Sequence, residues 1–302
     1  RVVDVFGDGD TISDAEIFGF DYWPMELFKL KNKPAPAQLD GHIIIVTGAG
    51  SGIGRGVALE LAKRGAHLVL ADIEEAGLHE VEKEFADNKC NPPLLVLGDQ
   101  SKEADVQATV TRTIKHFGGL DGVVINAGIG ISDKLEDLDV EKWRRGLDIN
   151  LSSAFMLTKE SMKVMRKQKM GGSLVYIASK NAFSPGAGFG GYSVSKAGML
   201  QLMRIAALEG GNAGIRCNGI NPDAVFDNSK LWAGGIREQR AAAHGVKPED
   251  LEDFYASRNL LNARVRSLDV ARAAAFFLSD ESSRTTGSVI AVDGGVAAAF
   301  PR

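Results

Sequence analysis

The sequence predicts an α/β fold built on a doubly wound parallel sheet, in a single domain. Short apolar runs rich in β-branched residues, such as 42–46 and 122–125, alternate along the chain with stretches of helical periodicity. Several of these runs end in glycine, small or acidic residues, which is typical of the sheet edge where α/β proteins bind ligands. No short repeat or low-complexity tract interrupts the strand–helix units.

The first strand–helix unit carries a glycine-rich turn. Residues 42–46 form the expected strand, residues 47–54 the turn, and an apolar periodic stretch the following helix. In this context a pyrophosphate binds at the helix N-terminus. Gly48 permits the tight turn, while Gly52 and Gly54 let backbone and helix approach the phosphates and the sheet. The flanking strand and helix disfavour the alternative of a flexible glycine linker.

Asp72 ends the next expected strand, residues 66–72, about twenty residues beyond the glycines. An acid at that place accepts hydrogen bonds from an adenosine ribose. Glu74 and Glu75 follow, and no Arg or Lys lies beside Asp72 in the sequence, so a 2′-phosphate would meet like charge. NAD is therefore favoured over NADP as the cofactor. The alternative is an acid that only caps the next helix.

Two further runs extend the same sheet edge. Residues 94–99 form an expected buried strand that ends at Asp99, and residues 122–128 run into a turn of small residues, Asn126-Ala127-Gly128. Small residues at strand ends leave room for adenine and ribose. Each signal is weak alone, but the series traces the carboxyl edge of a parallel sheet.

The chemistry is predicted from Tyr192 and Lys196, which stand four residues apart. Positions i and i+4 share one face of a helix, so phenol and ammonium can point into the same cleft. A phenol has a reference pKa of about 10, and a nearby cation favours the phenolate and lowers that pKa. This suits proton transfer coupled to hydride transfer with a dinucleotide. A lone pair of this kind is typical of ordinary helix surfaces, and the preceding features favour the catalytic interpretation.

Together these motifs make the chain resemble the short-chain dehydrogenase/reductase family over about residues 40–296. The family's glycine turn matches residues 47–54, and its Asn-Ala-Gly matches residues 126–128. Its Thr-Gly matches residues 286–287, and its Val-Asp-Gly-Gly matches residues 292–295. Its four active-site residues match Asn150, Ser179, Tyr192 and Lys196. The resemblance implies a Rossmann fold of the short-chain dehydrogenase type and a nicotinamide cofactor.

The resemblance also implies a role for each active-site residue. Tyr192 takes the hydroxyl proton as hydride moves, and Lys196 binds the nicotinamide ribose and lowers the pKa of Tyr192. Ser179 holds the substrate oxygen, and Asn150 holds a water in a proton relay. The expected cofactor-binding residues are Gly48, Ser51, Gly52, Ile53, Gly54, Asp72, Asp99, Gln100, Asn126, Ala127, Gly128, Tyr192, Lys196, Pro222, Asp223 and Val225.

One position departs from the family pattern. The family's Asn-Pro-Gly appears here as Asn221-Pro222-Asp223. Glycine gives the backbone freedom near the nicotinamide, and aspartate tolerates unusual backbone angles better than most residues. Two readings stay open: the Asp223 carboxylate interacts with the carboxamide or the substrate, or it points to solvent.

Three segments sharpen the resemblance: an N-terminal arm at 20–30, an insertion at 226–261, and the C-terminal stretch 292–302. They are similar to the dehydrogenase half of the bifunctional rhamnulose-1-phosphate aldolase/alcohol dehydrogenase proteins. The resemblance implies action on L-lactaldehyde in rhamnose catabolism.

The same resemblance predicts the domain organisation. We expect residues 1–39 to be an arm and linker at the junction to an aldolase domain, and residues 40–302 to be the NAD-binding domain with a substrate lid at 226–261. The start at Arg1 agrees with a longer chain, and the alternative is a stand-alone dehydrogenase with a trimmed start. Within the lid, aromatic side chains either pack against one another or touch the substrate.

Composition agrees with a soluble, cytoplasmic enzyme. The chain has 302 residues, enough for one large α/β domain, and a net charge of −4, which gives no electrostatic case for nucleic acid or anionic membrane. Two cysteines, Cys90 and Cys217, form no framework of bridges, and no apolar run is long enough for a membrane span. The five histidines share no ligand spacing with Cys, Asp or Glu, so no metal site is expected.

The family resemblance implies a homo-oligomer, either a tetramer or a dimer. Two alternatives to the lactaldehyde assignment stay open. The first is a dehydrogenase for another polyol, sugar or secondary alcohol. The second is a scaffold that holds oligomers of an attached aldolase together.

Overall fold

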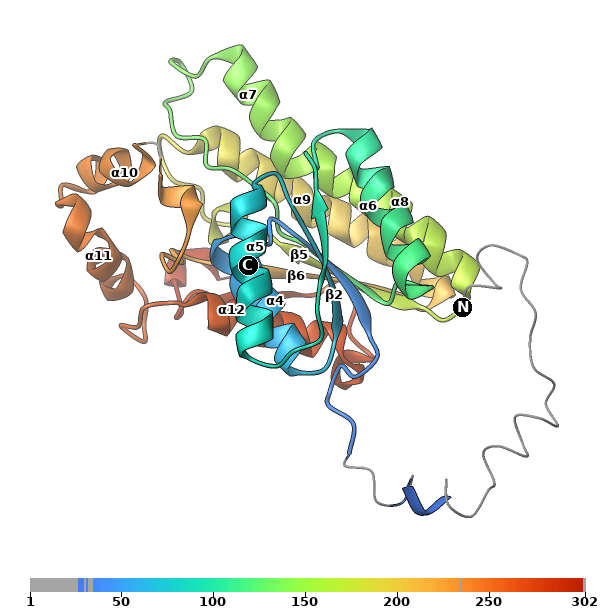
Figure 1. The fold of residues 1–302 in the computed structure, drawn as a ribbon. Coiled ribbons are helices and arrows are strands. Elements are labelled where there is room, and N and C mark those ends of the chain that lie inside the picture. Colours follow the sequence, from blue (N-terminus) through green and yellow to red (C-terminus); the bar gives the residue numbers. More distant parts are fainter. Residues whose placement is uncertain (1–26, 30, 32–34, 234, 301–302) are drawn as a thin grey trace.

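The computed structural model describes residues 27–29, 31, 35–233 and 235–300 (Figure 1). Most of the expected arm at 20–30 lies outside these residues. A seven-stranded parallel sheet forms the centre, in the order β3-β2-β1-β4-β5-β6-β7. The strands are β1 (Ile43–Thr47), β2 (His67–Asp72), β3 (Leu94–Leu97), β4 (Gly122–Ile125), β5 (Gly172–Ile177), β6 (Ile215–Pro222) and β7 (Val289–Val292). The predicted doubly wound fold is confirmed.

Helices cover both faces of the sheet because each buried strand is apolar on both sides. In β1, Ile44 and Val46 face one core, whereas Ile45 faces the other. The first core is covered by α4 (Gly52–Lys63), α5 (Glu75–Asp87) and α12 (Ser267–Leu278). The second is covered by α6 (Glu103–Phe117), α8 (Ser153–Gln168) and α9 (Gly190–Gly210). Among the described residues, no helix is long and apolar enough to cross a membrane.

The strand order reverses next to β1, and this places the site. The chain runs from β1 to β2 and β3 on one side, then returns to pair β4 with the other side of β1. The turns after β1 and β4 therefore diverge and leave a crevice at the carboxyl ends of the strands. Thr47 ties the two turns together, because its Oγ1 accepts the amides of Asn126 (3.1 Å) and Ala127 (3.2 Å).

Two segments outside the sheet layers shape the site. The first comprises α7 (Val140–Leu147) and a π-helical turn, Asp148–Ser152, that leads into α8. The second is the insertion at 226–261, which holds a 3-10 turn at Lys230–Trp232, α10 (Ile236–His244) and α11 (Leu251–Ser257). Figure 1 shows the insertion in orange at one end of the molecule.

Candidate active site

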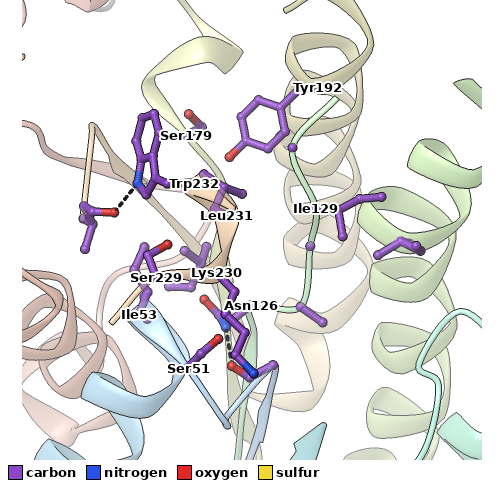
Figure 2. Close-up of a pocket in the computed structure, with 18 of the residues that line it drawn as sticks. Ser51, Ile53, Asn126, Ile129, Ser179, Tyr192, Ser229, Lys230, Leu231 and Trp232 are labelled. Carbon is purple, nitrogen blue, oxygen red and sulfur yellow. Dashed lines mark hydrogen bonds between the residues drawn. The ribbon is translucent and has the colours of Figure 1, made fainter. Parts of the chain in front are cut away.

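A cavity of about 560 Å³ lies along the carboxyl ends of the strands. It is lined by the segments that follow β1 to β6 and by the insertion, as Figure 2 shows for part of its wall. Most of the residues predicted for the site line it: Gly48, Ser51, Gly52, Ile53, Asp72, Asp99, Gln100, Asn126, Ala127, Gly128, Ser179, Tyr192, Lys196, Pro222, Asp223 and Val225. Gly54 and Asn150 are not among the lining residues.

The glycine turn has the conformation that its sequence requires. Gly48 has φ +63° and Gly52 has φ +49°, a region that side chains disfavour. Gly54 serves packing instead, because a Cβ at that position would lie 2.0 Å from the Gly48 carbonyl oxygen. The Gly52 amide donates to the Asn228 carbonyl (2.7 Å), so part of the insertion rests on the N-terminus of α4. A phosphate at that amide would replace this hydrogen bond.

Asp72 fixes the backbone around the cavity. Its Oδ2 accepts the Gly50 amide (2.8 Å) and its Oδ1 accepts the Glu74 amide (3.0 Å), so the carboxylate joins the glycine turn to the start of α5. The absence of nearby cations holds in the sequence but not in space, because Lys230 of the insertion forms an ion pair with Glu74. Sequence spacing could not reveal this contact, since the two residues are 156 positions apart.

Asp99 and Gln100 lie beyond the end of β3, which closes at Leu97 rather than at Asp99 as expected. The Asp99 side chain turns back into its own loop, where it accepts the amide (3.0 Å) and hydroxyl (2.7 Å) of Ser101. The hydroxyl contact lowers the pKa of Asp99 most. The Gln100 amide nitrogen donates to Thr109 Oγ1 (3.2 Å). Asp99 therefore shapes the cavity wall through the loop it stabilises.

Three of the predicted catalytic side chains, those of Ser179, Tyr192 and Lys196, line the cavity and come from α9 and from the segment after β5. Tyr192 and Lys196 lie one turn apart on α9, with exposed fractions of 7% and 4%. Ser179 follows the end of β5, and Figure 2 shows the Tyr192 hydroxyl pointing toward it. The Lys196 Nζ donates to the Ile177 carbonyl (2.8 Å) and lies 5.8 Å from the centre of the Tyr192 ring.

Burial controls the acid–base properties of this pair. It raises the pKa of Tyr192 to about 12, although a hydrogen bond with Ser179 acts in the opposite direction. It also lowers the pKa of Lys196 to about 8. Burial is therefore the largest influence on the Tyr192 pKa in the protein alone, and the expectation that Lys196 lowers this pKa stays a prediction.

Asn150 lies behind the cavity wall in the π-helical turn and is fully buried. Its side chain accepts the Ile129 amide (2.8 Å) and donates to the Ile129 carbonyl (3.0 Å) and to Ser195 Oγ (3.1 Å). These bonds fix the loop after β4 to α9. In this structure Asn150 therefore positions Ile129, which lines the cavity.

Asp223 faces the cavity rather than solvent, with an exposed fraction of 8%. The left-handed backbone conformation falls on Ala224, at φ +50°, and not on Asp223. The glycine of the family pattern is therefore not needed at this position. Burial raises the pKa of Asp223, while Lys180 and Arg258 act to lower it.

The structure adds residues that the sequence did not single out for the site. Lys180 follows Ser179 directly, and Arg240 comes from α10. Both line the cavity, together with Trp232 and Tyr255 of the insertion. Trp232 also stacks on Phe226, with ring centres 4.1 Å apart, so it both packs within the insertion and lines the cavity. No sequence motif marks Lys180 or Arg240, because their importance comes from burial.

Comparisons with known proteins agree with this geometry. A family model described as enoyl-(acyl carrier protein) reductase matches residues 48–297. The chain is 36% identical over 293 residues to the uncharacterized oxidoreductase YuxG of Bacillus subtilis, covering 97% of this chain but only 42% of that protein. It is 33% identical to a short chain dehydrogenase/reductase of Aspergillus oryzae, covering 86% of this chain and 96% of that protein.

A solved structure shows the same fold. The crystal structure of levodione reductase superposes with a TM-score of 0.79 at 30% identity, covering 87% of this chain and all of that one. Levodione reductase of Leifsonia aquatica is also 31% identical in sequence over 86% of this chain and 95% of its own. With the family model and these relatives in agreement, the chain belongs to the short-chain dehydrogenase/reductase family, a family of oxidoreductases.

Proposed function

We propose that this protein is an NAD-dependent oxidoreductase that acts on a small alcohol or aldehyde, with Tyr192 as the general acid and base. The observation that supports this most is the convergence of Ser179, Tyr192 and Lys196 on the cavity that the glycine turn also lines. A nicotinamide dinucleotide bound there would accept or supply the hydride. The turn after β1 would hold its phosphates, and Lys196 its nicotinamide ribose.

The proposed proton transfer depends on Tyr192 and Lys196, the two buried residues of α9 that line the cavity. Tyr192 takes the substrate hydroxyl proton, and Ser179 holds the substrate oxygen in reach of the phenol. Burial raises the pKa of Tyr192 to about 12, so the phenol needs a nearby positive charge to act as a base, and we propose that Lys196 supplies it during catalysis. Asn150 orders the neighbouring loop through Ile129, and we propose that it also holds the water of a proton relay.

The preference for NAD follows from Asp72. Its carboxylate lines the cavity beside Glu74, and both would repel a 2′-phosphate. Because Lys230 pairs with Glu74, the repulsion depends mainly on Asp72.

We propose L-lactaldehyde as the substrate, with another polyol, sugar or secondary alcohol as the alternative. The support is the resemblance of the arm and insertion to bifunctional aldolase/dehydrogenase proteins, together with a relative of which this chain matches only 42%. Oxidation would proceed through the aldehyde hydrate. A thiolate route is disfavoured because Cys217 is buried in β6, and burial raises its pKa to about 12.

We also propose that the protein forms a homo-oligomer and acts beside an aldolase domain in a longer chain. On α9, Val194, Ile205 and Leu208 expose 49%, 44% and 83% of their surface. Their spacing places them on one stripe of the helix, and exposed apolar stripes of this kind favour association. A purely scaffolding role predicts that assembly persists without any turnover.

The test follows reduced nicotinamide by absorbance, with NAD or NADP and L-lactaldehyde, for the wild type and Tyr192→Phe. We expect turnover with NAD that the phenylalanine variant loses by a factor on the order of 10² or more. Turnover with other alcohols only would exclude lactaldehyde. If cofactor binds but neither lactaldehyde nor any alcohol, polyol or ketone in a panel reacts, the catalytic proposal fails and a scaffolding role is favoured.

A further inference from the structure

Two buried cations line the cavity near Tyr192. Lys180 has an exposed fraction of 7%, and Arg240 one of 8%. Lys180 opens the 3-10 turn that follows Ser179, and Arg240 reaches in from α10. The Arg240 guanidinium lies 5.3 Å from the Phe189 ring, whose centre is 4.7 Å from that of Tyr192. Both cations therefore belong to the end of the cavity where the substrate would react.

The hydrogen-bond partners of these two cations are all neutral. The Lys180 Nζ donates to the Ser184 carbonyl at 3.3 Å. Arg240 donates to the Ala187 carbonyl (3.2 Å) and the Tyr255 hydroxyl (3.4 Å), and it lies 3.0 Å from His244 Nε2. Burial and the neighbouring arginines lower the pKa of His244, which favours the neutral imidazole.

No carboxylate in the described part of the chain lies within 4.0 Å of either cation. The ion pairs found there involve other lysines and arginines. A buried charge is costly unless it is paired, and lysine and arginine are rarely buried without a partner. The absence of a carboxylate within 4.0 Å therefore points to a negative charge supplied by a ligand.

In the group formed by Lys180 and the charged residues that act on it, cations outnumber carboxylates. Lys180 interacts electrostatically with Arg240 and Arg258, and with the acids Asp223 and Asp293. Three cations thus face two carboxylates. Asp293 does not line the cavity, and its Oδ1 accepts the Gly295 amide (2.8 Å). Because Asp223 lines the same cavity, an anion of single charge such as a carboxylate suits this place better than a phosphate ester, whose charge approaches two.

We propose that Lys180 and Arg240 form an anion subsite for a carboxylate carried by the substrate, so that the enzyme prefers hydroxy acids or oxo acids to neutral alcohols of the same size. The subsite rests on the proposed hydride transfer, and it favours the alternative of another secondary alcohol over lactaldehyde, which carries no carboxylate. It orients the substrate by its charged end, while Ser179 and Tyr192 act on its hydroxyl or carbonyl group. A planar guanidinium next to an ammonium suits the two oxygens of a carboxylate.

The test compares ligands that differ in charge but hardly in shape. Lactate and 3-hydroxybutyrate are titrated against their amides, lactamide and 3-hydroxybutyramide, by calorimetry on the full chain with saturating NAD. We expect at least one acid to bind more tightly than its amide by a factor on the order of ten or more. Equal affinity of acid and amide in both pairs overturns the subsite without any substitution.

Substitutions then assign the effect to residues. Lys180→Gln and Arg240→Gln are expected to remove the preference for the acid, and Arg240→Lys to retain part of it. Arg237→Gln is the matched control, because Arg237 lies on the same helix but does not line the cavity. A preference that survives both glutamine variants, or that the Arg237 variant removes, contradicts the assignment. If a glutamine variant does not fold, the assignment is decided by whether Arg240→Lys keeps only part of the preference for the acid over its amide.

Two further arms separate the related possibilities. If inorganic phosphate binds more tightly than either acid, with the same dependence on Lys180 and Arg240, the subsite is one for a phosphate group and not for a carboxylate. Tyr192→Phe should bind the acids normally while failing to turn them over. Binding of the acids without turnover in the wild type would leave the subsite standing and remove the proposed oxidoreductase reaction, so the two failures are distinguishable.

Discussion

Replacing Lys196 by methionine should stabilise the protein while it abolishes catalysis. Lys196 is 4% exposed, and burial lowers its pKa from 10.5 to about 8. Each unit of pKa shift corresponds to about 1.4 kcal/mol, so holding this charge inside the fold costs about 3 kcal/mol at neutral pH. Methionine fills a similar volume without a charge. The variant also loses the 2.8 Å hydrogen bond to the Ile177 carbonyl, which costs about 1 kcal/mol of stability, so the net gain in stability is about 2 kcal/mol.

The pH dependence makes this prediction specific. Because the folded pKa of Lys196 lies below its unfolded value, the unfolded chain binds more protons between pH 8 and 10.5. The stability contribution of the lysine is therefore present above pH 10.5 and lost as the pH falls toward 8. At the high end Lys196→Met should be about 1 kcal/mol less stable than the wild type, because only the lost hydrogen bond remains. As the pH falls through this window, its stability relative to the wild type should rise by about 3 kcal/mol, to the net gain of about 2 kcal/mol, and stay constant below it. Folded Tyr192, with a pKa of about 12, stays protonated through this window in both proteins, so its contribution cancels in the difference.

Urea unfolding of both proteins across this pH window measures the effect, provided the m-values stay equal. Ser195→Ala is the control, since it alters a buried neighbour on the same helix without removing a titrating group. Its stability difference from the wild type should not change with pH. If the stability difference between Lys196→Met and the wild type likewise does not change with pH, the reasoning is refuted. That result would mean that the fold holds the charge of Lys196 at no extra cost.

Three other predictions concern the turn, the cofactor and assembly. Gly54→Ala should destabilise the fold by about 2–3 kcal/mol in urea, because its Cβ would lie 2.0 Å from the Gly48 carbonyl oxygen, whereas Gly211→Ala, with open space around it, should be near neutral. Asp72→Asn should lower the kcat/KM preference for NAD over NADP by a factor on the order of ten, and an unchanged ratio would remove Asp72 as the determinant. Leu208→Glu should reduce the particle mass in sedimentation with little change in unfolding, since that side chain is 83% exposed; a mass that stays the same would exclude this stripe from any interface.

The sequence predicted the fold well because its signals are local. The strand at β1 and the glycine turn after it are recognisable within about a dozen residues, and the alternation of strands with helices fixes the parallel sheet. Tyr192 and Lys196 were found for the same reason, since one helical turn separates them. Ser179 and Asn126 follow strands whose ends must meet at one edge. These features need no knowledge of which distant segments touch.

The properties that were missed depend on contacts between distant segments. The insertion contacts the segments that follow β1 and β2, where Lys230 pairs with Glu74 and the Asn228 carbonyl accepts the Gly52 amide. A pKa is missed in the same way, since the pKa of Tyr192 responds mainly to burial of the phenol by the whole fold. Sequence spacing identifies which groups share a face, but it does not show how much water reaches them.

Burying three cations in one site costs folding free energy that apolar side chains would not. Lys180, Lys196 and Arg240 are all almost fully buried, and none forms an ion pair with another described residue. A fold selected for stability alone would place apolar side chains at these positions. Each cation instead lines the cavity where a charged or polar ligand atom would lie, so its burial cost is offset only when the ligand binds. The protein with cofactor and a carboxylate ligand should therefore gain less stability than the sum of the two ligands measured separately if both relieve the same positive charge, and the full sum if they act independently.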